Sequence, residues 1–140
     1  MKSAWIKGFD IQFSEAIKGM KRIPNIDADA WINKEGTKIV VLKWVNDDYY
    51  PTYCWLETDT STDRSYNNAG YKLVAINAKM YLLHRLVATT WVANPNHYNE
   101  VDHIDSNKKN NSADNLEWVT RKENMKRYYD KRRESYECKV

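Results

Sequence analysis

The chain has 140 residues, of which 42% are apolar and 29% are charged, and its net charge is +3. This length suits one domain, or one small domain with an arm. Six Trp and ten Tyr supply enough buriable surface to exclude a disordered chain. No apolar run approaches the ~20 residues of a membrane span, and the first ten residues lack the apolar core of a signal peptide. We therefore expect a cytoplasmic protein with no membrane partner.

The two cysteines, Cys54 and Cys138, lie far apart in the sequence and outside any CxxC pattern. They predict neither a disulfide framework nor a four-thiolate zinc site. We therefore expect no structural zinc. Cys54 stands in an apolar YCWL run, which is typical of a small core residue.

The positive charge is unevenly distributed. Residues 1–70 carry 9 basic and 10 acidic side chains, whereas residues 71–140 carry 13 and 9. The stretch 121–133 alone holds seven basic residues against Glu123 and Asp130. Such a segment suits an anionic polymer, and a solvated helix face has the same composition, so charge alone leaves both interpretations open.

The first half of the chain is predicted to be rich in strands. Apolar residues at roughly helical spacing favour a short helix over 10–21. β-branched and aromatic runs then predict strands over 37–45 and 49–56. The polar segment 57–70 follows and is the best candidate for a boundary between subdomains.

The second half is predicted to contain a hairpin, a helix, two short strands around a polar loop, and a last helix, over residues 71–83, 83–93, 100–119 and 121–133. The last helix has a clear start, because Thr120 can cap it and Glu123 completes a capping box. The fold class is therefore α+β, with a β-rich module before a mixed second half.

Four polar residues stand where a loop and a helix start could bring them together. Asp102 and His103 are adjacent, Asn115 follows the polar loop, and Asn124 lies in the first turn of the last helix. A His with a pKa near ~6.5 can take a proton from water at neutral pH. One carboxylate and one amide oxygen are hard ligands that suit Mg²⁺. This chemistry fits phosphodiester hydrolysis, although an exposed Asp-His pair with no chemistry would read the same way.

Three sequence blocks resemble the HNH (His-Me finger) endonucleases, in particular the phage and intron homing and nicking type. The blocks are HRLVA from His84, VDHIDSNKKNN from Val101, and DNLEWVTRKEN ending at Asn124. The resemblance covers about residues 66–127. It implies a ββα-metal core, here assigned to an HNH nuclease domain over 71–140 that follows an N-terminal β-rich module over 1–70.

The resemblance also implies a role for each residue of the core. His103 would be the general base, and Asp102 and Asn124 would ligate one divalent metal, Mg²⁺ or alternatively Mn²⁺. Asn115 would tie the loop to the hairpin and orient His103. The activity implied is a metal-dependent DNA endonuclease that nicks or cuts duplex DNA. A phage or another mobile element would encode it.

Basic residues near this core are predicted to contact double-stranded DNA, and the 1–70 module is a further candidate for DNA contact. The predicted contacts are Arg85, Lys108, Lys109, Arg121, Lys122, Lys126 and Arg127. We expect His84 to bond to backbone, and turn chemistry suffices to explain Asn107, Asn110 and Asn111. A homodimer is left open. The alternative function is a DNA-binding module with an inactive HNH core.

Overall fold

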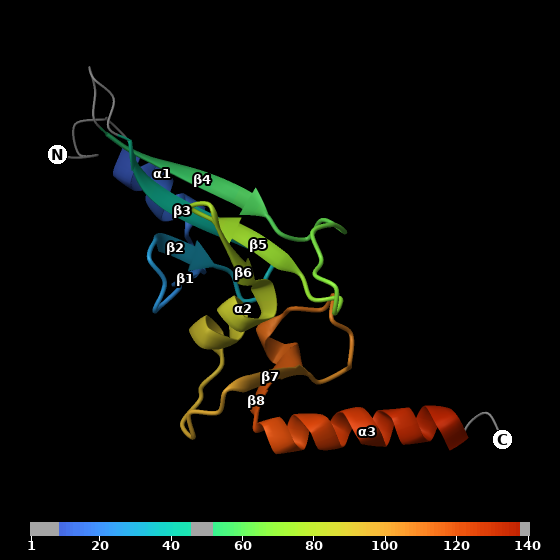
Figure 1. The fold of residues 1–140 in the computed structure, drawn as a ribbon. Coiled ribbons are helices and arrows are strands. Elements are labelled where there is room, and N and C mark those ends of the chain that lie inside the picture. Colours follow the sequence, from blue (N-terminus) through green and yellow to red (C-terminus); the bar gives the residue numbers. More distant parts are fainter. Residues whose placement is uncertain (1–8, 46–51, 138–140) are drawn as a thin grey trace.

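The structure is a computed structural model that describes residues 9–45 and 52–137 (Figure 1). Predictions for residues 49–51 and for Cys138 lie outside these ranges. The helices are α1 (Phe9–Ala16), α2 (Leu83–Trp91) and α3 (Arg121–Glu137), with a short 3₁₀ turn at Ala113–Asn115. The strands are β1 (Lys21–Arg22), β2 (Asp29–Ile32), β3 (Lys38–Val45), β4 (Thr52–Asp59), β5 (Leu73–Ile76), β6 (Lys79–Leu82), β7 (Glu100–His103) and β8 (Leu116–Val119). The predicted α+β class is confirmed.

The N-terminal half forms an antiparallel sheet in the order β1-β2-β3-β4. The helix α1 packs on this sheet through Phe13, whose ring centroid lies 5.1 Å from that of Trp31 and 5.9 Å from that of Trp55. The helix ends at Ala16, earlier than predicted, and Gly19 follows with a φ of +78° that an α-helix does not contain. Cys54 is exposed on β4, so the prediction of a core position was wrong.

Two further hairpins frame α2. The β5–β6 hairpin turns at Asn77 and Ala78, whose φ values of 52° and 65° give the left-handed conformation that a two-residue hairpin turn needs. The β7–β8 hairpin follows α2 and leads directly into α3. The Thr120 hydroxyl accepts a hydrogen bond from the Glu123 backbone at 3.0 Å, so the predicted helix cap is confirmed.

One hydrophobic cluster lies between the sheet and α2. It contains Ile32 and Val41 from the sheet, Val87 from α2 and Leu116 from β8, all of them buried. The Trp91 indole donates a 3.0 Å hydrogen bond to the Ile32 carbonyl and joins α2 to β2. Residues from both 1–70 and 71–140 therefore contribute to one core. The division of the chain into domains at these bounds stays a prediction.

The segment after β4 is held down by a buried lysine. Lys72 is 5% exposed, and its ammonium donates hydrogen bonds to the carbonyls of Thr62 and Arg64. Burial lowers the pKa of Lys72. The predicted boundary loop is therefore bonded to Lys72 at the start of the second half. The strand β4 ends at Asp59, three residues later than predicted.

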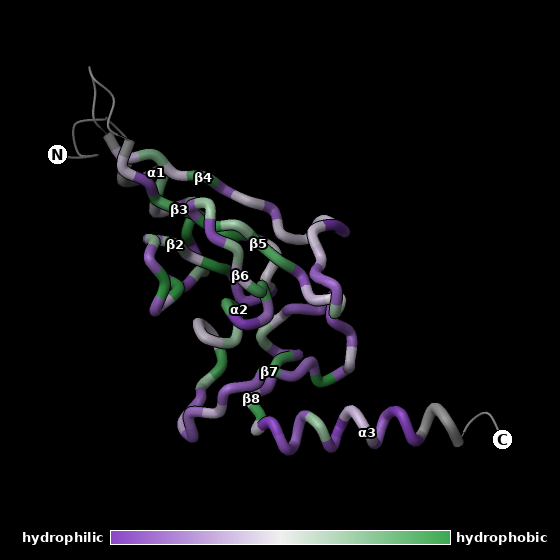
Figure 2. The backbone as a smooth tube through the Cα atoms, viewed as in Figure 1, coloured by the Kyte–Doolittle hydropathy of each residue, from purple (hydrophilic) through white to green (hydrophobic). Residues whose placement is uncertain are grey.

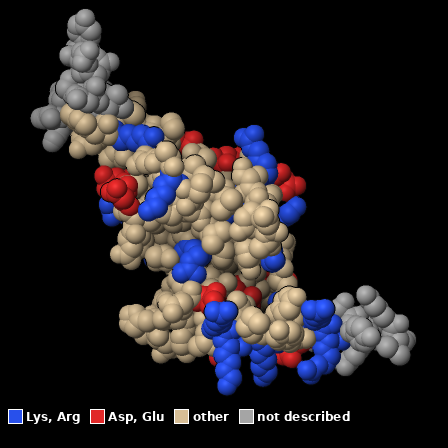
Figure 3. Space-filling model, in the orientation of Figure 1, with Lys and Arg blue, Asp and Glu red and all other residues tan. Residues whose placement is uncertain are grey.

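The helix α3 runs along one end of the molecule and projects past the body toward the C-terminus (Figure 1). The coloured part of α3 in Figure 2 is predominantly hydrophilic. Lys and Arg side chains gather over it (Figure 3). No helix among the described residues is long and apolar enough to cross a membrane.

Candidate functional site

A pocket of about 240 Å³ lies where the β7–β8 hairpin meets α3. Asp102 and His103 reach it from the end of β7, and Asn124 reaches it from the first turn of α3. The structure thus brings together three of the four residues that the sequence predicted for the core. The other lining residues are Tyr71, Ser106, Lys108, Arg127, Tyr128 and Lys131.

Asp102 is paired with a cation at this pocket. Its Oδ2 accepts a hydrogen bond from Arg127 Nη1 at 3.0 Å, and Arg127 Nη2 donates to Glu117 Oε1 at 2.9 Å. The side chain of Asp102 is 16% exposed and that of Arg127 is 37% exposed. The hydrogen bonds to Glu117 and Asp102 raise the pKa of Arg127, so the guanidinium stays charged.

His103 is buried, with 3% of its surface exposed, and its Nε2 lies 2.8 Å from Oδ1 of Asn111. An amide oxygen only accepts hydrogen bonds, so this contact requires the hydrogen of a neutral His103 on Nε2. The lone pair of the neutral ring is then on Nδ1. Asn111 is itself buried, at 6% exposure. The sequence suggested turn chemistry for Asn111, whereas the structure shows it bonded to the key histidine.

A second histidine, His84, lies next to His103. The His84 ring stacks on Tyr71 at 4.7 Å between centroids and lies 5.1 Å from the His103 ring. His84 Nδ1 is buried and has no hydrogen-bond partner among the described residues, so the predicted bond to backbone is not found there. Burial, with smaller effects from His103 and Arg85, lowers the pKa of His84 to about 3. His84 is therefore neutral at physiological pH.

Asn115 holds the polar loop together. Its Oδ1 accepts from the Asp105 backbone at 3.0 Å, and its Nδ2 donates to Asp105 Oδ1 and to the Asn110 carbonyl, both at 2.9 Å. Hydrogen bonds from Asn107, Asn115 and Asn110 lower the pKa of Asp105. Asn115 does not line the pocket. Its contacts are those of a residue that ties a loop to a hairpin.

The oxygens available at the pocket suit a small hard cation. Asn124 presents an amide from the start of α3, and its side chain enters none of the hydrogen bonds found among the described residues. Asp102 supplies a carboxylate. No cluster of three or more His, Cys, Asp or Glu that could hold a metal occurs in the described part of the chain. Two protein oxygens at a solvent-accessible pocket fit Mg²⁺, which retains several waters.

The predicted DNA contacts occupy different surroundings. Lys108 and Arg127 line the pocket, and the Lys108 ammonium lies 4.7 Å from the Tyr71 ring centroid. Arg121, Lys122 and Lys126 are exposed on α3, as predicted for either a phosphate contact or a wet helix face.

Two of the predicted contacts already have protein partners. Arg85 donates to the Asn99 carbonyl at 2.8 Å and lies over the Trp118 ring at 5.6 Å. Lys109 forms a 3.0 Å ion pair with Asp63, in which both side chains are exposed. Both contacts therefore compete with any phosphate for these cations.

Sequence reasoning missed Tyr71, Asn111, Tyr128 and Lys131. The last two could have been found, because Asn124, Tyr128 and Lys131 recur at the spacing of one helix face, so a ligand on that face would meet all three. Nothing local in the sequence distinguishes Asn111 from the other asparagines of its loop.

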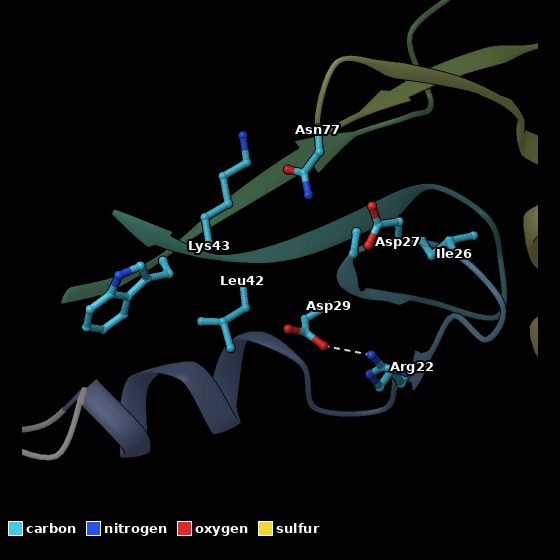
Figure 4. Close-up of a pocket in the computed structure, with 9 residues that line it drawn as sticks. Arg22, Ile26, Asp27, Asp29, Leu42, Lys43 and Asn77 are labelled. Carbon is cyan, nitrogen blue, oxygen red and sulfur yellow. Dashed lines mark hydrogen bonds and ion pairs between the residues drawn. The ribbon is translucent and has the colours of Figure 1, made fainter. Parts of the chain in front are cut away.

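A second cavity, of about 610 Å³, lies on the N-terminal sheet, away from these residues. Figure 4 shows Lys43 and Asn77 on one side of it and the Arg22–Asp29 ion pair, 2.6 Å long, on the other. Its acidic residues include none of those predicted to act in hydrolysis. The pocket at β7 and α3 is therefore the better candidate site.

Comparison with known proteins finds one family that matches part of this chain. Residues 81–126 match the model of the HNH endonuclease family. An uncharacterized HNH endonuclease of Acanthamoeba polyphaga mimivirus, L245, is 48% identical over 75 residues, covering 51% of this chain and 23% of its own length. YosQ, an SPbeta prophage-derived protein of Bacillus subtilis (strain 168), is 43% identical over 63 residues, covering 45% of this chain and 36% of its own.

The fold has a solved counterpart. A structure of DNA binding and cleavage by the HNH homing endonuclease I-HmuI matches 80% of this chain and 58% of that chain, with a TM-score of 0.51 and 23% identity. The predicted resemblance to the HNH endonucleases is confirmed by the family match and by this fold. The matched regions span about a quarter of L245 and a third of YosQ.

Proposed function

We propose that the chain is a metal-dependent DNA endonuclease that hydrolyses a phosphodiester bond of duplex DNA. One observation carries the proposal: Asp102, His103 and Asn124, which come from a strand end and a helix start, line one pocket. The matching HNH segment and the fold shared with a homing endonuclease support it. The proposal includes a phage or another mobile element as the source, and with it the host cytoplasm as the location.

In this proposal Asp102 and Asn124 hold one divalent metal, Mg²⁺ or alternatively Mn²⁺. The bound metal would supply stabilisation for the charge that develops on the phosphate and the leaving oxygen. Asp102 is fixed from the other side by Arg127. Asn124 is presented by a capped helix start, so its backbone is held in place.

His103 acts as the general base. The bond from Nε2–H to Asn111 leaves Nδ1 as the nitrogen that takes the proton from the attacking water. Burial of the ring restricts its rotation, and Tyr71, whose ring centroid lies 5.9 Å from that of His103, covers one side. Asn115 contributes by holding the polar loop that follows His103.

The DNA backbone lies along the pocket and α3. Lys108, Arg127 and Lys131 line the pocket, and the exposed cations of α3 extend the positive surface. Such contacts position the duplex through its phosphates and read no sequence. A homodimer that supplies further contacts remains part of the proposal.

One observation favours a second function, a DNA-binding module with an inactive core. The carboxylate of Asp102 is already neutralised by Arg127. If that ion pair persists in the presence of metal, the chain binds duplex DNA and cleaves nothing.

The test is cleavage of supercoiled plasmid with Mg²⁺ or Mn²⁺, with and without a chelator. We expect nicked or linear DNA with metal, none with chelator, and none with His103→Asn. His97→Asn is the matched control, because His97 is exposed in a loop and Asn tolerates its positive φ of 54°. Equal amounts of intact plasmid with wild type and His103→Asn would refute the enzyme, and a metal-independent mobility shift would then support the binding module.

A further inference from the structure

The turn between β2 and β3 touches the polar loop that carries Asn111. Gly36 in this turn has a φ of +71°, and a Cβ built on it would lie 2.6 Å from the Asn111 carbonyl oxygen and 3.0 Å from Val87 Cγ2. Real Cβ atoms essentially never come as close as 2.6 Å to another heavy atom. Only glycine therefore fits here, on both backbone conformation and space.

The turn itself is held rigidly. Asn33 Oδ1 accepts from the backbone of Thr37 at 2.9 Å and of Lys38 at 3.1 Å. The Thr60 hydroxyl, which is buried, donates to the Gly36 carbonyl at 2.6 Å. The turn is thus braced both from within and from the end of β4.

A second contact joins the turn to the loop. The Ala113 backbone N–H donates to the Lys34 carbonyl at 2.9 Å. Asn111 therefore lies between two fixed points, since its own carbonyl rests against Gly36 and its neighbour Ala113 is bonded to Lys34. The Oδ1 atom of the Asn111 side chain lies 2.8 Å from Nε2 of His103.

We infer that the β2–β3 turn, through Gly36 and Asn111, positions His103 for its role as general base. This inference rests on the proposed function. It gives the N-terminal sheet a role in catalysis that is separate from any DNA contact. The sheet fixes the position of Asn111, and Asn111 fixes the tautomer and the ring orientation of His103. Gly36 and Asn111 are positioning residues, because neither lines the pocket.

The first test compares Gly36→Ala with Gly19→Ala. Gly19 has nearly the same φ, +78°, and nothing lies within 4 Å of a Cβ built on it, so the control reproduces the backbone strain without the contact. The readout is the imidazole ¹H–¹⁵N spectrum, which reports the tautomer of each of the three histidines. We expect the His103 signals to change in Gly36→Ala and to stay as in wild type in Gly19→Ala.

Cleavage kinetics supply the second readout. A base displaced by about an ångström loses on the order of a hundredfold in rate, so we expect kcat of Gly36→Ala to fall about ten- to a hundredfold while KM stays unchanged. In an Asn111→Ala background, adding Gly36→Ala should have little further effect on kcat, because the link is already broken. If the two substitutions lower kcat independently, so that their effects multiply in the double variant, the inference is contradicted.

Thr60→Val is the variant to use if Gly36→Ala does not fold, since it keeps the side-chain shape and removes the brace on the Gly36 carbonyl. A folded variant of either kind whose His103 signals match wild type overturns the inference. The spectrum does not depend on cleavage. A wild type that cuts no DNA would refute the proposed function, while the spectra would still decide whether the turn positions His103.

Discussion

Arg127 donates from Nη1 to Oδ2 of Asp102 across 3.0 Å, so the carboxylate proposed to bind the metal is already paired with a guanidinium. A metal and an arginine that share one carboxylate compete, because each reduces the negative charge that attracts the other. The free state of the protein therefore carries a built-in competitor for its proposed cofactor.

Replacement of Arg127 by glutamine should strengthen metal binding. The pair is partly buried, so we take the upper end of the range for surface ion pairs, about 1 kcal/mol, which corresponds to a gain in Mn²⁺ affinity of about fivefold. Titration calorimetry with Mn²⁺ in the absence of DNA measures it. Lys126→Gln is the control, because it removes a neighbouring exposed charge that does not line the pocket. Equal gains in both variants would point to net charge and not to competition.

The buried His84 should make folding stability depend on pH. Its pKa is about 3 when folded against an ordinary 6.5, so the unfolded chain binds more protons between these values, and stability falls as pH drops below 6.5. Between pH 7 and pH 5 the loss is about 2 kcal/mol. Urea unfolding of His84→Phe, which keeps an aromatic ring on Tyr71, should show a pH dependence smaller by that amount. An unchanged difference between the two pH values would contradict the burial of a neutral ring.

The loop tied by Asn115 should open when its amide is removed. Asn115→Ala loses three hydrogen bonds and leaves partners unsatisfied, which should cost about 2–3 kcal/mol of unfolding free energy. Asn107→Ala, in an exposed position with one local acceptor bond, should cost clearly less. Urea denaturation at neutral pH measures both. If Asn115→Ala and Asn107→Ala lose similar unfolding free energies, Asn115 contributes no more to the loop than its other asparagines do.

Cations at the pocket should dominate the salt dependence of DNA binding. Each phosphate contact contributes about 0.9 to the slope of log K against log salt concentration. Lys131→Gln should therefore lower the slope by about one contact, whereas Lys109→Gln, already paired with Asp63, should lower it less. Fluorescence anisotropy in a His103→Asn background separates binding from cleavage. A larger effect at Lys109 would reverse this ranking of the contacts.

The elements of the fold were largely predictable, because the hairpins and helices have local signals. Alternating and β-branched runs gave β3 and the β5–β6 hairpin, and Thr120 marked the start of α3. The short helix α1 was placed correctly at its start, but its end was missed, because spacing alone does not show where a helix ends. Cys54 was misjudged because it shares the exposed face of β4 with Leu56, whereas Tyr53 and Trp55 on the opposite face are half-buried.

The candidate site was predictable in part for the same reason. Asp102, His103 and Asn124 occur in blocks whose order and spacing indicate one core. The partner of His103 was not predictable, because the loop holds several asparagines and only the folded loop buries Asn111. The contact between Gly36 and Asn111 joins segments that are distant in the sequence, and no spacing pattern in either segment predicts it.

The hydrogen bond from Trp91 to the Ile32 carbonyl has a consequence for any transfer of the HNH-like segment into another protein. Residues 81–126 match the family, yet the cluster that buries Val87 of α2 also contains Ile32 and Val41, which lie outside that segment. A gene fragment that encodes the matched segment alone would contain the residues proposed for catalysis but would lack the apolar residues that pack with α2. A graft into another protein would have to bring the β2–β3 hairpin with it, or rebuild an equivalent wall from the host.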